Sequence, residues 1–284
     1  MATGIRLDRE EYIEQAYFFR VFRERLASEL VAQEILQRIH DEILSTTRLP
    51  YAIQFLATEL KHTGLLSSGF GRLPHYFTPF QAFVIRQTET EMVRISIETA
   101  LLILEREAAY RAGNPVAPGL FIYQFEVLCR NRLGYDEGLT SIAGDPFYEQ
   151  SWRDYLELIR RQIGAVEFAD LVYLRSELYR AEQRRQDPHY ESPWPALFGE
   201  KEGKIAKANR GHDPLYLFAA LQRQLGYPEV PRPKPADDLA AQLTALQAKL
   251  REMEMRLKLV ESEVRGQVDL SHFGKPEILA DEED

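Results

Sequence analysis

Apolar residues recur at helical spacing along most of the chain before Gly226. Within "VAQEILQRIHDEIL", the residues Ile35, Leu36, Ile39 and Ile43 fall on one face of a helix. The same spacing recurs in later stretches, for example at Ile53, Leu56, Ala57 and Leu60 and again at Ile97, Leu101, Leu104 and Ala108. Sustained apolar/polar alternation is absent from the sequence, and so is an Asn-Gly hairpin turn. The pattern therefore predicts an all-α fold, an antiparallel helical array or bundle with short connections.

Polar residues mark where several of these helices begin. Asp8 followed by Glu11 predicts a capping box at the start of the first helix, because each side chain can accept a backbone N–H bond across that turn. Thr78, directly before Pro79, predicts a cap and first-turn pair. Ser96 predicts the cap of the next helix.

The tetrapeptide Asp-Pro-x-Tyr occurs three times, at Asp145, Asp187 and Asp213. Asp accepts backbone N–H bonds at a cap, and Pro fits the first turn, where its missing N–H does no harm. An apolar periodic run follows Asp145 and Asp213, so both predict helix starts. Asp187 leads into "YESPWPALFG", whose prolines predict an extended strap pinned by Trp194 and Phe198.

Beyond the prolines of "YPEVPRPKPADD", apolar residues alternate in steps of four and three. We call these positions the seam: Leu239, Leu243, Leu246, Leu250, Met253, Leu257, Val260 and Val264. This spacing is typical of the a and d positions of a left-handed coiled coil. In a parallel pair, Lys249 faces Glu254 of the other helix and Arg256 faces Glu261, so the charges favour that orientation. The seam therefore predicts a homo-oligomer, with a dimer preferred.

Two alternatives to self-association remain for the seam. The helix can pack back against its own globular domain, which also requires an apolar stripe, or it can recruit a helix of a different protein. The narrow two-in-seven stripe and the stiff proline spacer before it favour a coiled coil over a helix packed on its own domain.

The chain divides into five predicted segments. Residues 1–186 form an all-helical globular domain, and residues 187–227 a polar strap plus a short helix that packs on it. A Pro-rich linker covers 228–236, the coiled-coil helix 237–265, and an acidic, mobile tail 266–284.

Composition and charge narrow the function classes. Hydrophobic residues make up 45% of the chain, enough to bury a core, and the net charge is −9 with a pI near 5.4. The acidic balance argues against nucleic acid and anionic membrane as partners, because the summed field repels both. The single cysteine, Cys129, fits a reducing compartment, the N-terminus carries no secretory signal, and no apolar run is long enough to span a bilayer. We expect a soluble cytoplasmic protein.

Four cations occupy every third position in "FGEKEGKIAKANRGHD", at Lys201, Lys204, Lys207 and Arg210. On a helix, steps of three lag by about 60° each, so these side chains spread over about half of the circumference. Nearby acidic residues offset three of the four charges, and no aromatic residue is interleaved to stack on bases. The stretch predicts a solvated connector. A docking surface for an acidic protein segment, such as the chain's own residues 279–284, is the alternative.

Few residues point to chemistry. Glu59 and His62 form one Glu-x-x-His, the ligand pair of di-iron bundles, but no second copy exists, so we expect a surface helix end and no metal. Cys129 lies in an apolar helical context and predicts a small core residue instead of a nucleophile. "GEKEGK" has one residue too few between its glycines for a phosphate loop, and Ile205 replaces the required hydroxyl.

These observations predict a non-enzymatic scaffold or adaptor, without cofactor or catalytic residues, that self-associates through a parallel coiled coil. The alternative is a helical-bundle enzyme or small-ligand sensor whose site lies between helices. Polar residues within the apolar helices are the candidates for that site: Tyr17, Arg20, Tyr123, Arg130, Tyr173 and Arg175. The competing interpretation pairs these long side chains with Glu126, Asp170 and Glu177.

Overall fold

A computed structural model gives the fold of residues 6–90 and 94–232, and of Leu246, Lys249, Leu250, Met253 and Leu257. In these residues the secondary structure consists of thirteen α-helices and one short 3₁₀ helix, with no strand, which confirms the all-α prediction. The helices are α1 (Arg9–Ala27), α2 (Ala32–Ile39), η1 (His40–Glu42), α3 (Leu49–Thr63), α4 (Leu66–Arg72), α5 (Pro79–Arg86), α6 (Ile97–Ala112), α7 (Ala117–Arg130), α8 (Tyr135–Ala143), α9 (Gln150–Gln162), α10 (Phe168–Leu174), α11 (Glu177–Gln186), α12 (Glu200–Ala208) and α13 (Pro214–Leu225).

The chain forms two compact units, residues Met1–Pro233 and Lys234–Asp284. We call the first the body and the second the C-terminal unit. In the C-terminal unit the five described residues are helical, as predicted for 237–265. The rest of that segment and the predicted tail, 266–284, lie outside the described residues.

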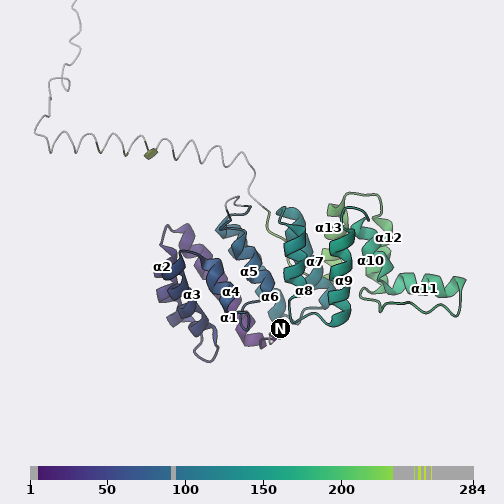
Figure 1. Cartoon of the computed structure of the whole chain (residues 1–284), viewed down its shortest axis with the longest axis horizontal. Helices are drawn as coiled ribbons and strands as arrows, with labels where there is room; N and C mark the ends of the chain where they lie inside the picture. The colour runs from purple at the N-terminus through teal and green to yellow at the C-terminus, as the bar shows by residue number, and fades with distance from the viewer. Residues whose placement is uncertain are drawn as a thin grey trace, which may run out of the picture. The chain divides into compact units, whose positions relative to one another are not determined.

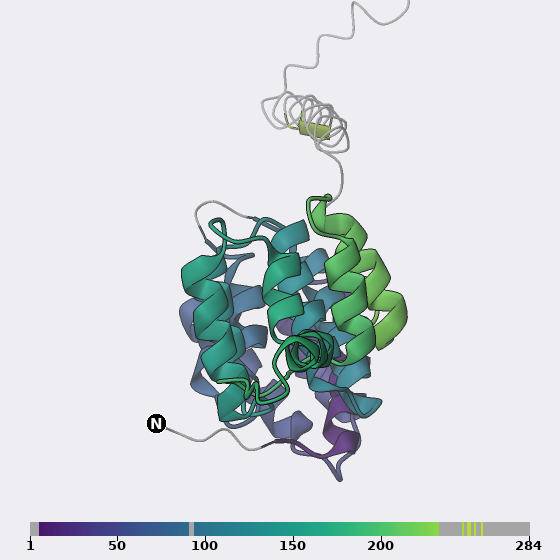
Figure 2. The same ribbon diagram turned by 90° about the vertical axis from the view of Figure 1, so that its right-hand side faces the viewer.

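Within the body, the helices lie in a row, with α2 and α3 at one end and α11 at the other (Figure 1). Figure 2 views the body from the α11 end. The longest helix, α1, packs along α6, and α7 packs against α6, α8 and α13. One continuous hydrophobic cluster runs through the body. The helices of the row therefore share a single hydrophobic core.

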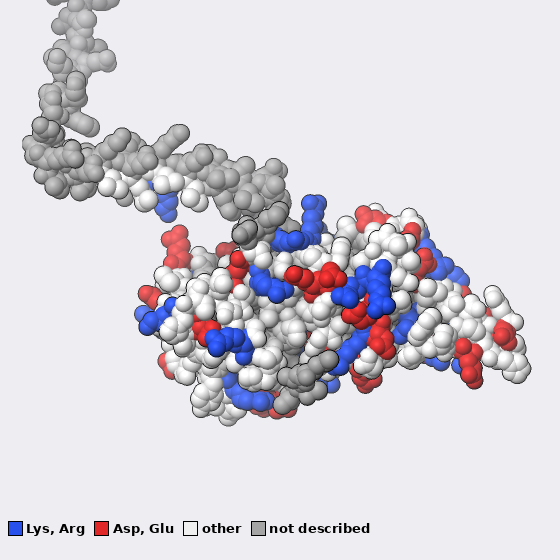
Figure 3. Space-filling model, viewed as in Figure 1, with Lys and Arg blue, Asp and Glu red and all other residues white. Residues whose placement is uncertain are grey.

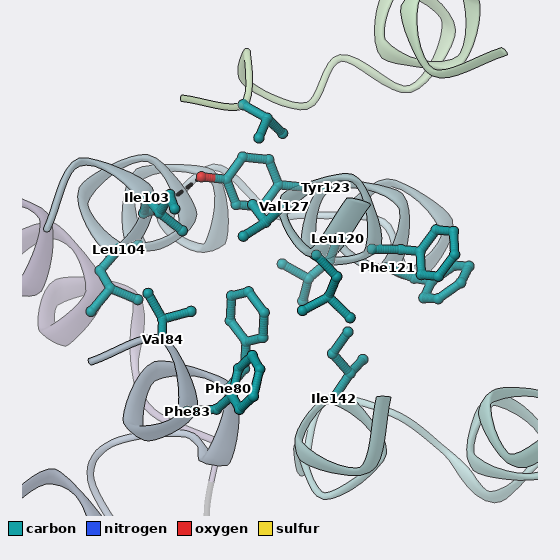
Figure 4. Packing of buried hydrophobic residues seen from close by; sticks show 14 of the residues in the cluster. Phe80, Phe83, Val84, Ile103, Leu104, Leu120, Phe121, Tyr123, Val127 and Ile142 are labelled. Carbon is teal, nitrogen blue, oxygen red and sulfur yellow. Dashed lines mark hydrogen bonds between the residues drawn. The ribbon is translucent and has the colours of Figure 1, made fainter. Parts of the chain in front are cut away.

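Helix α7 lies at the centre of this core. All ten residues from Gly119 to Leu128 are buried, as expected for a helix that is apolar on every side. Figure 4 shows Leu120 and Tyr123 of α7 among side chains of α5, α6 and α8. The only polar atom of the Tyr123 side chain, its hydroxyl, donates to the backbone oxygen of Ile103 at 2.8 Å. This buried polar group is thus satisfied within the core.

The predicted caps at Thr78 and Ser96 are present. Thr78 forms a capping box with Gln81 at the start of α5, and Ser96 accepts the Thr99 backbone N–H at the start of α6. Both predictions are confirmed because caps are local, set by a few consecutive residues.

The capping box predicted at Asp8 and Glu11 is wrong. α1 does begin after Asp8, but the Asp8 side chain makes no cap hydrogen bond. The Glu11 carboxylate is buried and accepts the Arg48 backbone N–H at 2.9 Å and the Tyr76 hydroxyl at 2.7 Å. Long-range donors, one of them at the start of α3, therefore displace the local cap.

The three Asp-Pro-x-Tyr copies share one local structure. Each Asp carboxylate accepts the backbone N–H two residues later, at 2.9, 3.0 and 2.9 Å for Asp145, Asp187 and Asp213. Asp213 is the cap of α13, as predicted. The helix start predicted at Asp145 is wrong, because α9 begins only at Gln150. Asp145 is fully buried, and its second carboxylate oxygen pairs with Arg111 instead.

The strap that follows α11 is anchored at one of its two predicted residues. Phe198 is buried against Trp152 and Tyr155, and its backbone oxygen accepts the Glu177 N–H at 2.9 Å. Trp194 remains 56% exposed. The Trp194 ring still lies 5.8 Å from the Arg175 guanidinium, and the Leu197 backbone N–H donates to the Arg175 oxygen at 2.8 Å, so the strap is held mainly at its end, just before α12.

The predicted linker, 228–236, begins within the body. Val230 of this linker is buried. Tyr227, the residue directly before the linker, is also buried, and its hydroxyl donates to the Glu126 carboxylate at 2.7 Å. Asn131 donates to the backbone oxygen of Pro231 at 3.2 Å. Proline favours an extended backbone, and the carbonyl oxygens of such a backbone remain free to accept hydrogen bonds from side chains. This stretch therefore packs on the body without forming a helix or strand. The boundary of the body falls at Pro233.

The shared turn makes a matched pair of variants possible. Asn keeps the turn-forming oxygen of Asp but removes its charge. We expect Asp145→Asn to lower the free energy of unfolding by about 3 kcal/mol, because it breaks a buried ion pair. The exposed Asp187→Asn is expected to change it by less than about 0.5 kcal/mol. Denaturant unfolding followed by circular dichroism measures both; equal losses in the two variants would show that the ion pair at Asp145 does not stabilise the fold.

Candidate functional site

An exposed apolar stripe with regular spacing lies in the described residues of the C-terminal unit. The four described seam residues, all helical, are 62%, 49%, 52% and 61% exposed: Leu246, Leu250, Met253 and Leu257. Their steps of four, three and four place them on one face of the helix. An apolar stripe of this kind is what a coiled coil buries, so these residues form our first candidate site. The other four seam positions lie outside the described residues.

The body carries a groove of about 880 Å³ between α4, α5 and α8. Buried aromatic side chains line it: Phe70, Phe77 and Phe83. At its edge Arg86 of α5 pairs with Glu137 of α8 at 3.0 Å. Figure 3 shows charges of both signs interspersed over this face of the body, without a large area of either sign. The groove is thus an apolar hollow with a polar, locally balanced edge.

The six residues predicted to line a site between helices do not line this groove. Arg130 pairs with Glu126, as the competing interpretation expects, whereas Asp170 and Glu177 pair with other arginines. The remaining five make separate contacts: Tyr17 with Glu42, Arg20 with the Tyr17 ring, Tyr123 with Ile103, Tyr173 with Glu182, and Arg175 with the Tyr155 ring. The structure does not bring these six residues together.

A cluster of charged and polar side chains lies inside the core, and the sequence analysis did not identify it. Arg111 of α6 donates to Glu107 at 2.9 Å and to Asp145, and Gln124 of α7 donates to Glu107 at 2.7 Å. The Tyr148 hydroxyl donates to Gln124 at 2.7 Å. We call these five residues the core cluster. The available signal was a Glu and an Arg four positions apart within an apolar helix.

The electrostatics of the core cluster follow from its burial. Burial raises the pKa of Glu107, although Arg111 beside it acts in the opposite direction. Burial alone would lower the pKa of Arg111, but the neighbouring Asp145 and Glu107 carboxylates raise it well above its ordinary value. Arg111 therefore stays charged inside the core.

Three of the four predicted docking cations make ion pairs with carboxylates of the body: Lys204 with Glu200 (2.6 Å), Lys207 with Glu182 (2.8 Å) and Arg210 with Asp170 (2.6 Å). The Arg210 guanidinium also lies 4.2 Å from the centre of the Tyr173 ring. Lys201 is exposed on α12. An acidic partner at this surface would compete with the existing pairs, and the docking surface stays a prediction.

Glu59 and His62, the weak metal candidates, make contacts with different parts of the body. The Glu59 carboxylate accepts from Arg72 at 2.6 Å and from Ser68 at 3.3 Å. His62 is exposed and lines a separate hollow together with His40. Throughout the described part of the chain, no group of three or more His, Cys, Asp or Glu residues is placed to hold a metal ion.

In the residues that the structure describes, no helix combines the length and apolar character that crossing a membrane requires. No protein-family model, no curated protein and no solved structure matches this chain.

The environment of Cys129 predicts a slow thiol. Burial raises the pKa of Cys129 to about 12, so very little thiolate exists near neutral pH. We expect alkylation by iodoacetamide at pH 8 to be at least about 100-fold slower in the folded chain than in urea, because the thiolate is the reacting form. Mass spectrometry of timed samples measures both rates. Similar rates would contradict the burial of this thiol.

Proposed function

We propose that this protein is a non-enzymatic scaffold or adaptor that self-associates, preferably as a dimer, through a parallel coiled coil of its C-terminal unit. The observation that supports this proposal is the exposed apolar stripe at Leu246, Leu250, Met253 and Leu257. Cysteine usage supports a cytoplasmic location, where a lone reduced thiol is stable.

The magnitude of this association follows from area burial. Fully burying one large apolar side chain contributes about 1.5–3 kcal/mol, and these residues are about half exposed, so each gains about 1 kcal/mol. Four residues per chain, hence eight per dimer, give about 8 kcal/mol, the free energy of a micromolar dissociation constant. Association also costs translational and side-chain entropy. The outer seam positions, Leu239, Leu243, Val260 and Val264, must therefore add to the interface.

A dimer of this kind would hold two bodies near each other. The last clamped residue of the body is Pro231, and eight residue steps from it to Leu239 span at most about 29 Å. From Leu239 to Val264 the seam covers about 39 Å as a helix. The body, or the acidic residues at the chain's end, would then contact a further partner.

Two neighbouring exposed positions give a matched test. We expect the full chain to sediment as a dimer at ~10 μM and Leu250→Gln to weaken dimerisation at least about tenfold, because it places an amide in the seam. Lys249→Gln, one residue away but outside the seam, is expected to change it by less than about threefold. Sedimentation velocity over a concentration series measures all three. A monomeric wild-type chain, or equal effects of the two variants, would contradict the proposal.

The groove favours a second function, that of a small-ligand sensor. Its volume of about 880 Å³ and its aromatic lining match those of typical ligand pockets, which occupy about 300–1,000 Å³. Acidic side chains balance the arginines at its edge, so the expected ligand is largely apolar and uncharged.

The sensor alternative predicts that filling the groove abolishes ligand uptake. Ala82 lines the groove, whereas Ala109 is exposed on α6 outside it. With the uncharged, apolar dye N-phenyl-1-naphthylamine as probe, we expect Ala82→Trp to lower the dye affinity of the full chain at least about tenfold, because the indole occupies the hollow. Ala109→Trp serves as the control in the same fluorescence titration. Unchanged affinity in Ala82→Trp would rule out the groove as a ligand site.

A further inference from the structure

The core cluster has no role in the proposed function and contains an unusual balance of charge. One cation, Arg111, lies between two carboxylates, and none of the three side chains is more than 2% exposed. Two ionised carboxylates beside one guanidinium would leave a net negative charge in a dry core, which is costly. One of the two carboxyl groups is therefore expected to hold a proton.

The hydrogen bonds distinguish the two carboxyl groups. Asp145 uses both oxygens, one toward Arg111 and the other toward the Phe147 backbone N–H at 2.9 Å. Glu107 uses only Oε1, which accepts from both Arg111 and Gln124. Its Oε2 is buried and has no hydrogen-bond partner. Because an ionised carboxylate needs donors to both oxygens when it is buried, Glu107 is the poorer site for the charge.

We propose that Glu107 carries a proton in the folded body at neutral pH, and that the core cluster is a pH-sensitive latch. In the protonated state the cluster is neutral overall, with Arg111 paired to Asp145. Loss of the Glu107 proton places an unbalanced charge where α6, α7 and the 145–148 turn meet, and so loosens this junction.

The other groups that face Glu107 strengthen this assignment. Burial raises the pKa of Glu107, Arg111 lowers it, and Asp145 raises it further. From α1, the Tyr12 ring lies under the Arg111 guanidinium, 5.7 Å away. The hydroxyls of Tyr12 and Tyr148 stay neutral, since burial raises the pKa of each. Arg111 is therefore the only cation of the cluster, and its charge is already balanced by the Asp145 carboxylate.

The direction of the pH effect follows from linkage. The pKa of Glu107 is higher in the folded chain than in the unfolded chain, where Glu has a pKa of about 4.3. The stability that its proton contributes is fully present below the unfolded value and is lost as the pH rises through the folded value. Between the two values the folding equilibrium constant falls about tenfold per pH unit. Surface carboxylates paired with a cation have the opposite effect: they stabilise the folded chain more as the pH rises.

The test compares two glutamates of one helix in the full chain. Glu107→Gln mimics the protonated acid, whereas Glu105 is partly exposed and pairs with Arg23 at 3.0 Å, which makes Glu105→Gln the control. Denaturant unfolding between pH 5 and pH 9 measures the folding equilibrium constant of each chain. In the wild type we expect this constant to fall about tenfold per pH unit, and in Glu107→Gln we expect that fall to be absent. Glu105→Gln is expected to retain that fall. A wild type and a Glu107→Gln variant with the same pH profile would overturn the proposal.

A second measurement covers the case in which Glu107→Gln does not fold. Infrared difference spectra of the folded wild-type chain report protonated carboxylic acids directly through their carbonyl stretch. We expect one such band at pH 7, where exposed carboxyls are ionised, and we expect it to disappear on unfolding at the same pH. The absence of this band in the folded chain would overturn the proposal.

Discussion

The ion pair between Arg111 and Asp145 joins parts of the body that are far apart in sequence. Arg111 belongs to α6, which packs along α1, whereas Asp145 begins the turn between α8 and α9. Because both side chains are excluded from water, neither charge is tolerated without the other, and their separation would cost several kcal/mol. Removal of this one contact would therefore destabilise both α6 and the turn between α8 and α9, which pack near α7.

Buried or partly buried carboxylates also connect distant segments at two helix starts of the body. A helix leaves its first backbone N–H groups without intrahelical partners. Here carboxylates from distant segments supply partners at the starts of α3 and α4: Glu11 accepts from Arg48, and Glu89 from both Leu66 and Ser67. These contacts satisfy backbone donors and at the same time hold neighbouring helices in place. The array gains tertiary specificity in this way, since the starts of α3 and α4 depend on carboxylates from other segments.

Local features of the sequence were sufficient for the fold class and insufficient for the packing. The helical period and the caps at Thr78 and Ser96 depend on residues within a few positions, so they were predictable. Glu11 and Asp145 resemble cap residues locally, but partners many residues away, Arg48 and Arg111, determine what they bind. The same limit applies to the candidate sites. The seam is a repeat of closely spaced residues and is visible in the sequence, whereas the groove and the core cluster combine several helices and become apparent only once these are packed.

The end of the body decides how much freedom the seam has relative to it. Proline content suggested a spacer from residue 228 onward, yet Tyr227 is buried on Glu126, and side chains of α6 and of the residue after α7 donate to the backbone oxygens of Glu229 and Pro231. A flexible spacer over that whole range would let two bodies in an oligomer sample many orientations. The contacts of Tyr227, Glu229 and Pro231 with the body remove that freedom from the first residues of the range. An oligomer built on this seam would therefore present its bodies over a narrower range of positions than the proline-rich sequence suggests, which favours a scaffold over a loose tether.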